Sequence, residues 1–245
     1  MAMTISVIVC AYNEERYVAR CLEAIGRQRR VPDEIILVDN ASADRTGEIA
    51  RGITGVRVVE EPRKGLVRAR RRGFDASRGS VVVYTDADCL PPAHWLERIE
   101  ARLGAHPDAV AITGTFRYYD WDRLSRACTR LYDLSVAPAT HLLVQDLLGW
   151  GAILYGGNFA VRREALLAIG GFDTSIEFHG EDTNLGRRLS RLGRVLLSDR
   201  CWVYTSARRF QAVGRMQVAT LYIRNFTHEI VYHEPADALH VDIRG

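Results

Sequence analysis

Four short apolar runs among residues 1–90, each followed by a stretch with helical periodicity, constrain the fold of this chain more than any other feature. The runs cover residues 5–10, 34–38, 56–59 and 80–85. Continuous runs of valine, isoleucine and leucine are typical of strands buried on both faces of a parallel sheet. Strands that alternate with helices predict an α/β fold, with a mostly parallel central sheet and helices on both faces. A chain of 245 residues, 47% of them apolar, can bury such a core.

The predicted helices of this first half begin soon after each strand. We expect Asn13 to cap the first helix and Ser42 to cap a second helix that ends near residue 51. A third helix is predicted over 66–77. The apolar face of the first helix is formed by residues at helical spacing, namely Val18, Cys21, Leu22 and Ile25.

The second half is less regular. The apolar stretch 141–155 is too short to span a bilayer and is interpreted as a core or acceptor-site helix, with a peripheral membrane contact as the alternative. An amphipathic helix over 214–233 packs on the body or on a partner subunit, and the sequence leaves both open. The other predicted helices are 91–103, 124–135, 164–169 and 181–192, and the predicted strands are 109–113, 195–197 and 202–204.

Two carboxylates follow the strand 80–85 directly. Asp86 and Asp88 are one residue apart, so both can project to the same side from the carboxyl end of that strand. Ligands of open α/β sheets bind at this edge. Paired carboxylates suit Mg²⁺ or Mn²⁺, which are usually held by a few carboxylates together with phosphate oxygens and water. The pattern therefore predicts a site for a metal and a diphosphate, although such a string also occurs in ordinary loops and caps.

Three further segments carry candidate site residues. Gly157 and Asn158 lie in a glycine-rich loop that could let the backbone approach an acceptor closely. Glu181 and Asp182 begin a helix, where acids are also simple partners of the helix dipole. Two adjacent arginines after the last strand are candidates for clamping a diphosphate, Arg208 and Arg209.

Composition narrows the class of protein. The formal net charge is +3, and among the 33 basic residues only Lys64 is a lysine. The basic run 63–72 lacks interleaved aromatic residues, so a nucleic-acid partner is not expected. The five cysteines have no paired spacing, which disfavours a disulfide framework or a zinc site. A strand that begins near residue 4 leaves no room for a signal peptide, and we expect a cytoplasmic protein, peripheral at most to the inner face of the membrane.

Six strings, taken in this order, resemble the family 2 glycosyltransferases, which have a GT-A fold that binds nucleotide-diphosphate sugars. They cover residues 7–15, 37–46, 64–73, 86–88, 170–173 and 181–188, and the resemblance ends near residue 209. It implies a GT-A domain over 1–210, with a nucleotide-binding half (1–115) and an acceptor-binding half (116–210), followed by a helical tail over 211–245. Cys10 stands where this family often has proline. Arg71 stands where asparagine is usual, and this difference bears on which nucleotide fits.

The resemblance also implies roles for single residues. Ala11, Tyr12 and Glu14 would line the nucleotide pocket, and Asp39 would accept a hydrogen bond from the base. Arg70 and Ala87 would also lie at the nucleotide. Asp86 would face the ribose or a metal-bound water, and Asp88 would bind the divalent cation. Asp182 would be the general base, with Gly157, Asn158 and Glu181 on the acceptor side.

The implied reaction is an inverting transfer from a nucleotide-diphosphate sugar to a hydroxyl acceptor, in glycan or cell-envelope biosynthesis. A UDP-sugar is the favoured donor, a GDP-sugar is the alternative, and the acceptor could be lipid-linked. A nucleotidyltransferase would usually show a glycine-rich loop after its first strand, where this chain has residues 11–15 without glycine. A noncatalytic sugar-nucleotide-binding protein would not need both Asp88 and Asp182. RNA binding through the arginine run is a third alternative, and it would depend steeply on salt.

Overall fold

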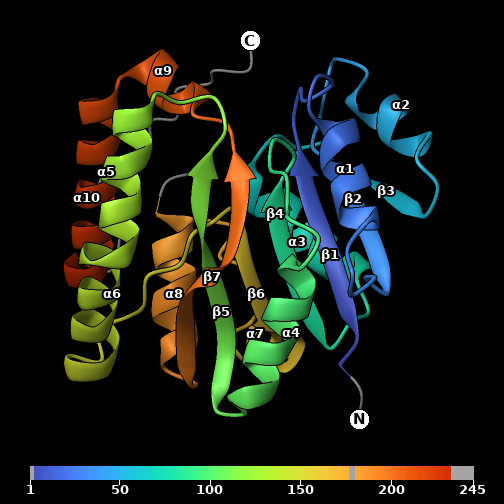
Figure 1. The fold of residues 1–245 in the computed structure, drawn as a ribbon. Coiled ribbons are helices and arrows are strands. Elements are labelled where there is room, and N and C mark those ends of the chain that lie inside the picture. The colour runs from blue at the N-terminus through green and yellow to red at the C-terminus, as the bar shows by residue number, and fades with distance from the viewer. Residues whose placement is uncertain (1–2, 177–179, 233–245) are drawn as a thin grey trace.

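Among the residues that the computed structural model describes, 3–176 and 180–232, a seven-stranded sheet forms the centre of the fold. The strand order is β3-β2-β1-β4-β6-β5-β7. β6 is antiparallel to both of its neighbours, and the other pairs are parallel. The predicted mostly parallel α/β sheet is thereby confirmed (Figure 1). The strands are β1 (Ile5–Ala11), β2 (Glu34–Asp39), β3 (Val56–Glu60), β4 (Val81–Asp86), β5 (Ala109–Tyr118), β6 (Asn158–Arg162) and β7 (Arg194–Thr205).

Helices cover both faces of this sheet. One apolar core lies between the sheet and the helices α1, α2 and α4, and contains the fully buried Trp95. The other lies between the sheet and α3, α7 and α8, where the rings of Tyr84 and Phe159 stack with centroids 4.8 Å apart. The central strands thus bury side chains on both faces, as their unbroken apolar runs predict. These six helices are α1 (Val18–Gly26), α2 (Thr46–Arg51), α3 (Leu66–Ala76), α4 (Trp95–Ala105), α7 (Arg163–Ala168) and α8 (Glu181–Ser190).

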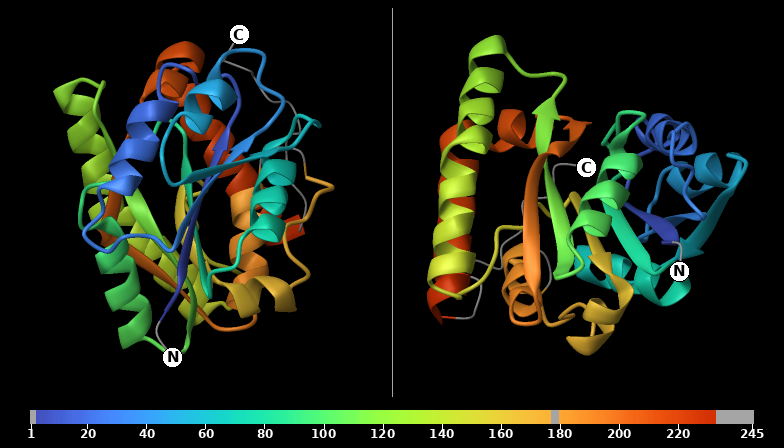
Figure 2. Two further views of the ribbon diagram at one scale, coloured as in Figure 1. Left: turned by 90° about the vertical axis from the view of Figure 1, so that its right-hand side faces the viewer. Right: turned by 60° about the horizontal axis from the view of Figure 1, so that its bottom comes forward.

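The remaining helices form a separate flank beside β7 and α8 (Figure 2). The predicted tail helix is present as α10 and packs on the body, because its buried Glu229 binds Arg187 of α8 with an Oε1 to Nη2 distance of 3.1 Å. Residue 233 lies outside the described residues. None of the described helices combines the length and the apolar character needed to cross a bilayer. The flank consists of α5 (Arg123–Leu134), α6 (Val136–His141), the π-helix η1 (Leu142–Leu147), α9 (Arg208–Val213) and α10 (Arg215–Tyr232).

Both predicted helix caps are wrong. Helix α1 begins at Val18 and α2 at Thr46, each without a side-chain cap. Asn13 instead accepts a hydrogen bond from the Ala43 amide at 2.9 Å, and Ser42 accepts one from the Asn13 amide at 3.1 Å. The two loops after β1 and β2 therefore hold each other, because parallel neighbours bring them to the same edge of the sheet.

Two other expectations for the second half need correction. The runs 195–197 and 202–204 belong to one long strand, β7, whose pairing with β5 shifts between Gly114 and Phe116. The stretch 141–155 is not a core helix, since η1 ends at Leu147 and Leu147 and Trp150 are exposed. Local apolar content does not reveal which way a short helix faces.

Candidate functional site

The carboxyl ends of β1, β2 and β4 meet at one edge of the sheet. In the register of these strands Ala11 lies beside Asp39, and Cys10 lies beside Asp86. Three strands that are distant in the sequence thus end with polar residues at the same edge. This is the edge where an open α/β sheet binds its ligands.

Asp88 lies just beyond β4 and is in contact with an arginine from the far end of the chain. A tight turn, closed by a 3.0 Å hydrogen bond from the Cys89 amide to the Asp86 carbonyl, positions it. Its Oδ2 is 3.0 Å from Nη2 of Arg208, the first residue of α9. The same guanidinium donates a hydrogen bond to the buried carboxylate of Glu14. Burial alone would lower the pKa of Arg208, but Glu14 and Asp88 outweigh it and raise that pKa, so the guanidinium stays charged.

A buried ion pair joins helix α3 to the start of α8. Arg70 is 2% exposed and pairs with Glu181, while its Nη2 donates to the Gly156 carbonyl at 2.5 Å. Burial raises the pKa of Glu181 to about 7, against the opposing effect of Arg70. The pair fixes α8 relative to the 156–157 loop. Both side chains are buried, and the predicted roles of Arg70 at the nucleotide and of Glu181 at the acceptor stay predictions.

Gly157 is pressed against the Asp86 carboxylate, with no room for a Cβ in between. The predicted close approach of this backbone is therefore present, but to Asp86. Asn158 does not fit acceptor binding, because it is fully buried and its side-chain amide is committed within the fold. It donates to the carbonyls of Thr115 and Cys201 and accepts from the Trp95 indole. The Asn158 side chain thus joins α4, β5 and β7.

Asp182 is in the first turn of α8, next to the buried Arg70–Glu181 pair. Its Oδ1 accepts a hydrogen bond from the Thr183 amide at 2.8 Å, and its side chain is only partly shielded from solvent. Burial raises the pKa of Asp182, which Arg70 partly offsets. Burial raises the pKa of Tyr222, and the nearby Asp182 and Asp86 carboxylates add to this effect. A carboxylate with a raised pKa in this position could accept a proton.

The other predicted nucleotide contacts fall at the same edge. Tyr12 lies under the Lys64 ammonium, 4.0 Å from the ring centroid. Asp39 accepts a 3.3 Å hydrogen bond from the Ser42 amide. Ala11 and Ala87 have buried side chains, so only their backbone atoms can face a ligand.

Arg209, the second predicted clamp residue, packs against the Tyr222 ring, with 5.9 Å to its centroid. The contacts of Arg71, which stands where asparagine is usual, are within α3 and to the 170–171 turn. Arg71 pairs with Asp75 of its own helix and donates to the Gly170 carbonyl.

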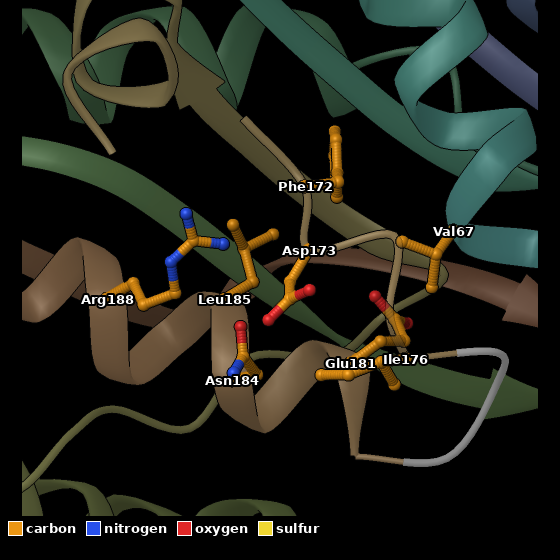
Figure 3. A pocket seen from close by; sticks show the side chains of 8 residues that line it. All are labelled: Val67, Phe172, Asp173, Ile176, Glu181, Asn184, Leu185 and Arg188. Carbon is orange, nitrogen blue, oxygen red and sulfur yellow. The ribbon is translucent and has the colours of Figure 1, made fainter. Parts of the chain in front are cut away.

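A narrow crevice lies between α3, the 172–176 segment and α8 (Figure 3). Glu181, Asn184 and Arg188 line it together with Phe172 and Leu185, but it has no space for a water molecule. It belongs to the packing of α8 rather than to a ligand site. The Gly170–Asp173 string thus contributes to holding the helix that carries Asp182.

The carboxylates at this edge fit a divalent cation bound together with a ligand. Among the described residues no group of three or more His, Cys, Asp or Glu side chains could hold a metal alone. Asp88 with Asp86 matches the kind of site in which one or two carboxylates share Mg²⁺ or Mn²⁺ with substrate phosphates and water. The Arg208 guanidinium, which pairs with Asp88, shows that a positive charge is stabilised at this position.

Sequence reasoning missed the contacts that join distant segments. Glu14 was expected at the nucleotide, but not as the partner of Arg208. Tyr119 was not selected, yet its hydroxyl is 3.4 Å from the Asp88 carbonyl. Gly156 was passed over in favour of Gly157, although a Cβ there would crowd Arg70 and Glu181. The only signal in the sequence was the paired glycine itself.

Comparison with known proteins gives a consistent match. A family model described as glycosyl transferase family 2 matches residues 6–170. The glycosyltransferase AglE of Haloferax volcanii is 27% identical over 200 residues, which cover 78% of this chain and 63% of that protein. The undecaprenyl-phosphate 4-deoxy-4-formamido-L-arabinose transferase of Pseudomonas paraeruginosa is 32% identical over 174 residues, 67% of this chain and 49% of the relative. The chain therefore spans about half to two thirds of the length of these relatives.

Solved structures share the fold. The mannosyltransferase PcManGT from Pyrobaculum calidifontis, in complex with GDP-Man and Mn²⁺, superimposes with a TM-score of 0.74 at 22% identity, covering 97% of this chain and 66% of that one. Glucosyl-3-phosphoglycerate synthase from Mycobacterium tuberculosis, in complex with Mn²⁺, UDP-glucose and phosphoglyceric acid, has a TM-score of 0.66 at 23% identity, covering 94% and 80%. At this identity the likeness establishes the fold alone.

Proposed function

This chain belongs to glycosyl transferase family 2, and on that premise we propose that it is an inverting, metal-dependent glycosyltransferase. It would move a sugar from a nucleotide-diphosphate sugar to an acceptor hydroxyl, in glycan or cell-envelope biosynthesis. One observation carries the proposal: Asp86 and Asp88 converge with the start of α8, which bears Asp182, at the carboxyl edge of the sheet. Gly157 against Asp86 and the Arg70 bond to Gly156 are the contacts that link them.

In the proposed reaction, the acceptor oxygen attacks the anomeric carbon while the bond from that carbon to the phosphate oxygen breaks. Asp182 takes the proton of the acceptor hydroxyl, and the nucleoside diphosphate leaves with the bonding electron pair. A bound Mn²⁺ or Mg²⁺ would stabilise the charge that builds on the leaving phosphate. Asp88 and Asp86 would hold this cation. A single displacement of this kind inverts the anomeric configuration.

Arg208 would act on the diphosphate from its place beside Asp88. Without ligands its guanidinium is bound by Asp88 and Glu14. A diphosphate offers the same kind of charged acceptor, and arginine binds phosphate oxygens through paired hydrogen bonds. We expect Arg208 to exchange its contact with Asp88 for the donor phosphates when a cation takes its place. Arg209 lies against the Tyr222 ring.

The substrates follow by chemical class. GDP-Man and UDP-glucose in the two similar structures favour a UDP- or GDP-sugar donor. The undecaprenyl-phosphate transferase among the relatives favours a lipid-linked acceptor. No observation favours the nucleotidyltransferase alternative.

The proposal is tested by thermal unfolding with UDP, GDP, ADP and CDP, each with and without Mn²⁺. A ligand that binds only the native state stabilises it, by about 2.7 kcal/mol at a concentration a hundred times its dissociation constant. We expect UDP or GDP to raise the melting temperature, and Mn²⁺ to enlarge the shift. Asp88→Asn should lose the Mn²⁺-dependent part only. If no nucleotide shifts the transition with or without Mn²⁺, the proposed donor site is wrong.

A further inference from the structure

Helix α5 buries polar side chains and exposes apolar ones. Its buried residues are polar, Ser125 and Asp133, whereas Leu124 is 71% and Leu131 is 67% exposed. Leu124 and Leu131 are separated by two helical turns and lie on one face. A helix that faces water usually buries its leucines and exposes its polar side chains. Because α5 has the reverse arrangement, its leucine face is suited to contact with an apolar surface.

The same character continues along the flank. Exposed leucines follow in η1 and after it, and the exposed Trp150 ends the series. Helix α10, which stands beside α5 and α6 in Figures 1 and 2, exposes Met216 and Ile223. Elsewhere in the described part of the chain, large exposed apolar side chains are scattered, namely Val31, Leu167, Leu192 and Tyr204. The outer surface of α5, α6, η1 and α10 is called the apolar flank below.

We propose that the apolar flank docks on the surface of a bilayer that contains anionic lipids. The positive charges on α5 favour a lipid surface over a second copy of the chain. Arg123 and Arg126 are exposed on α5, and neither has an ion pair within the described residues. A helix that exposes an apolar face together with unpaired arginines has the composition of a helix that lies in a membrane interface, where anionic headgroups neutralise the cations.

A two-fold dimer through α5 would place the arginines of both copies in one interface. The carboxylates of α5 and its cap could not compensate for them. Asp133 is buried, where it accepts a hydrogen bond from the Tyr155 hydroxyl at 2.7 Å, and Asp122 is paired with Arg215. Like charges without partners disfavour such an interface.

The apolar flank also lies next to a groove and to helix α9, which carries Arg208 of the candidate site. A groove of about 570 Å³ opens between the start of α5, α9 and the start of α10, and is lined by Trp121 and Phe210 among others. Helix α9 carries Arg208 at its first residue. Docking of the flank would therefore hold the groove and α9 close to the membrane. This link rests on the proposed function, because it matters only if the acceptor hydroxyl is carried by a lipid.

The test is sedimentation of the full chain with vesicles of phosphatidylcholine alone or mixed in equal parts with phosphatidylglycerol. We expect binding to the mixed vesicles, and a loss of at least about tenfold in the double variant Leu124→Gln with Leu131→Gln. Glutamine is a good helix former, so α5 should remain folded. The matched control is Leu167→Gln with Leu192→Gln, which removes leucines that are 60% and 48% exposed away from the flank and should change nothing. Arg123→Gln with Arg126→Gln should abolish the preference for phosphatidylglycerol.

Three results would overturn the inference. The first is failure of the unaltered chain to bind either vesicle, and the second is an equal loss in the control variant. The third is a concentration-dependent dimer in sizing experiments that the Leu124 and Leu131 changes abolish, which would assign the flank to a second copy. Nucleotide-induced thermal shifts are measured on the same variants. They should be unchanged, so that failure of the donor site and failure of the docking surface are read separately.

Discussion

The sheet edge at β1, β2 and β4 and the apolar flank place polar and apolar side chains in opposite ways. At the sheet edge, charged side chains are buried as ion pairs, for example Arg70 with Glu181. On the flank, α5 buries Asp133 and turns Leu131 outward. Burying an ion pair costs desolvation and is a weak source of stability, so the pairs at the edge mark positions where side chains must be held in place. A series of exposed leucines indicates a surface that binds a partner or a membrane.

The sharpest test of the edge is Asp88→Asn. If Asp88 holds the cation that neutralises the leaving diphosphate, its loss should reduce metal-dependent transfer by about a thousandfold. Donor hydrolysis and transfer assays, together with Mn²⁺ binding followed by electron paramagnetic resonance, measure both consequences. Circular dichroism should be unaltered, because asparagine has nearly the same size and shape as aspartate. Undiminished transfer would remove Asp88 from the mechanism.

Asp182→Asn separates chemistry from binding at the same edge. A positioned base contributes about 10²–10⁴-fold, so transfer should fall at least about a hundredfold while nucleotide binding survives. Burial raises the pKa of Asp182. A base must be deprotonated, so the acid limb of the rate profile should lie above the pH range of an ordinary aspartate and should vanish in the variant. An unchanged rate would point to Glu181 or Asp173 as the base.

Glu229→Ala tests how the flank is fastened. It would leave Arg187 buried on α8 without its partner, and we expect a loss of about 3 kcal/mol in the free energy of unfolding. Urea denaturation measures this loss. Glu229→Gln, which keeps an acceptor oxygen for the 3.1 Å bond from Asn184, should cost less. Glu23→Ala breaks an exposed pair and should cost under about 0.5 kcal/mol. Equal effects of the buried and exposed changes would show that the Arg187–Glu229 pair does not hold α10 on the body.

Arg208→Gln should have the smallest effect, because it changes a contact between the regions rather than either one. Loss of a charge-assisted phosphate contact should weaken nucleoside diphosphate binding about tenfold. In the same variant Mn²⁺ should bind the nucleotide-free protein more tightly, because Asp88 no longer has a competing guanidinium. Calorimetry of both ligands resolves the two effects. Arg209→Gln is the control, and weaker Mn²⁺ binding in Arg208→Gln would refute the exchange.

The predictions from sequence were accurate where the signal is local. Strand β4 ends within one residue of its predicted boundary, and α10 covers the predicted tail helix. The caps at Asn13 and Ser42 failed because a side chain next to a helix start can bond a neighbouring loop just as well. Asn158 was selected as polar and next to glycine, but its side chain bonds α4, β5 and β7, which come together only in the folded chain. The roles of Asp88 and Asp182 stay predictions.

The sequence alone determined the alternation of strands and helices, the sheet that follows from it, and the carboxylates that leave β4, because these depend on the order of neighbouring side chains. Only the tertiary structure decided that Arg208 reaches Asp88, that Arg70 pairs with Glu181, and that the leucines of α5 face outward. Residues 120 or 111 positions apart meet only after the whole sheet has formed. A helix of mixed composition does not reveal which face the rest of the chain will cover.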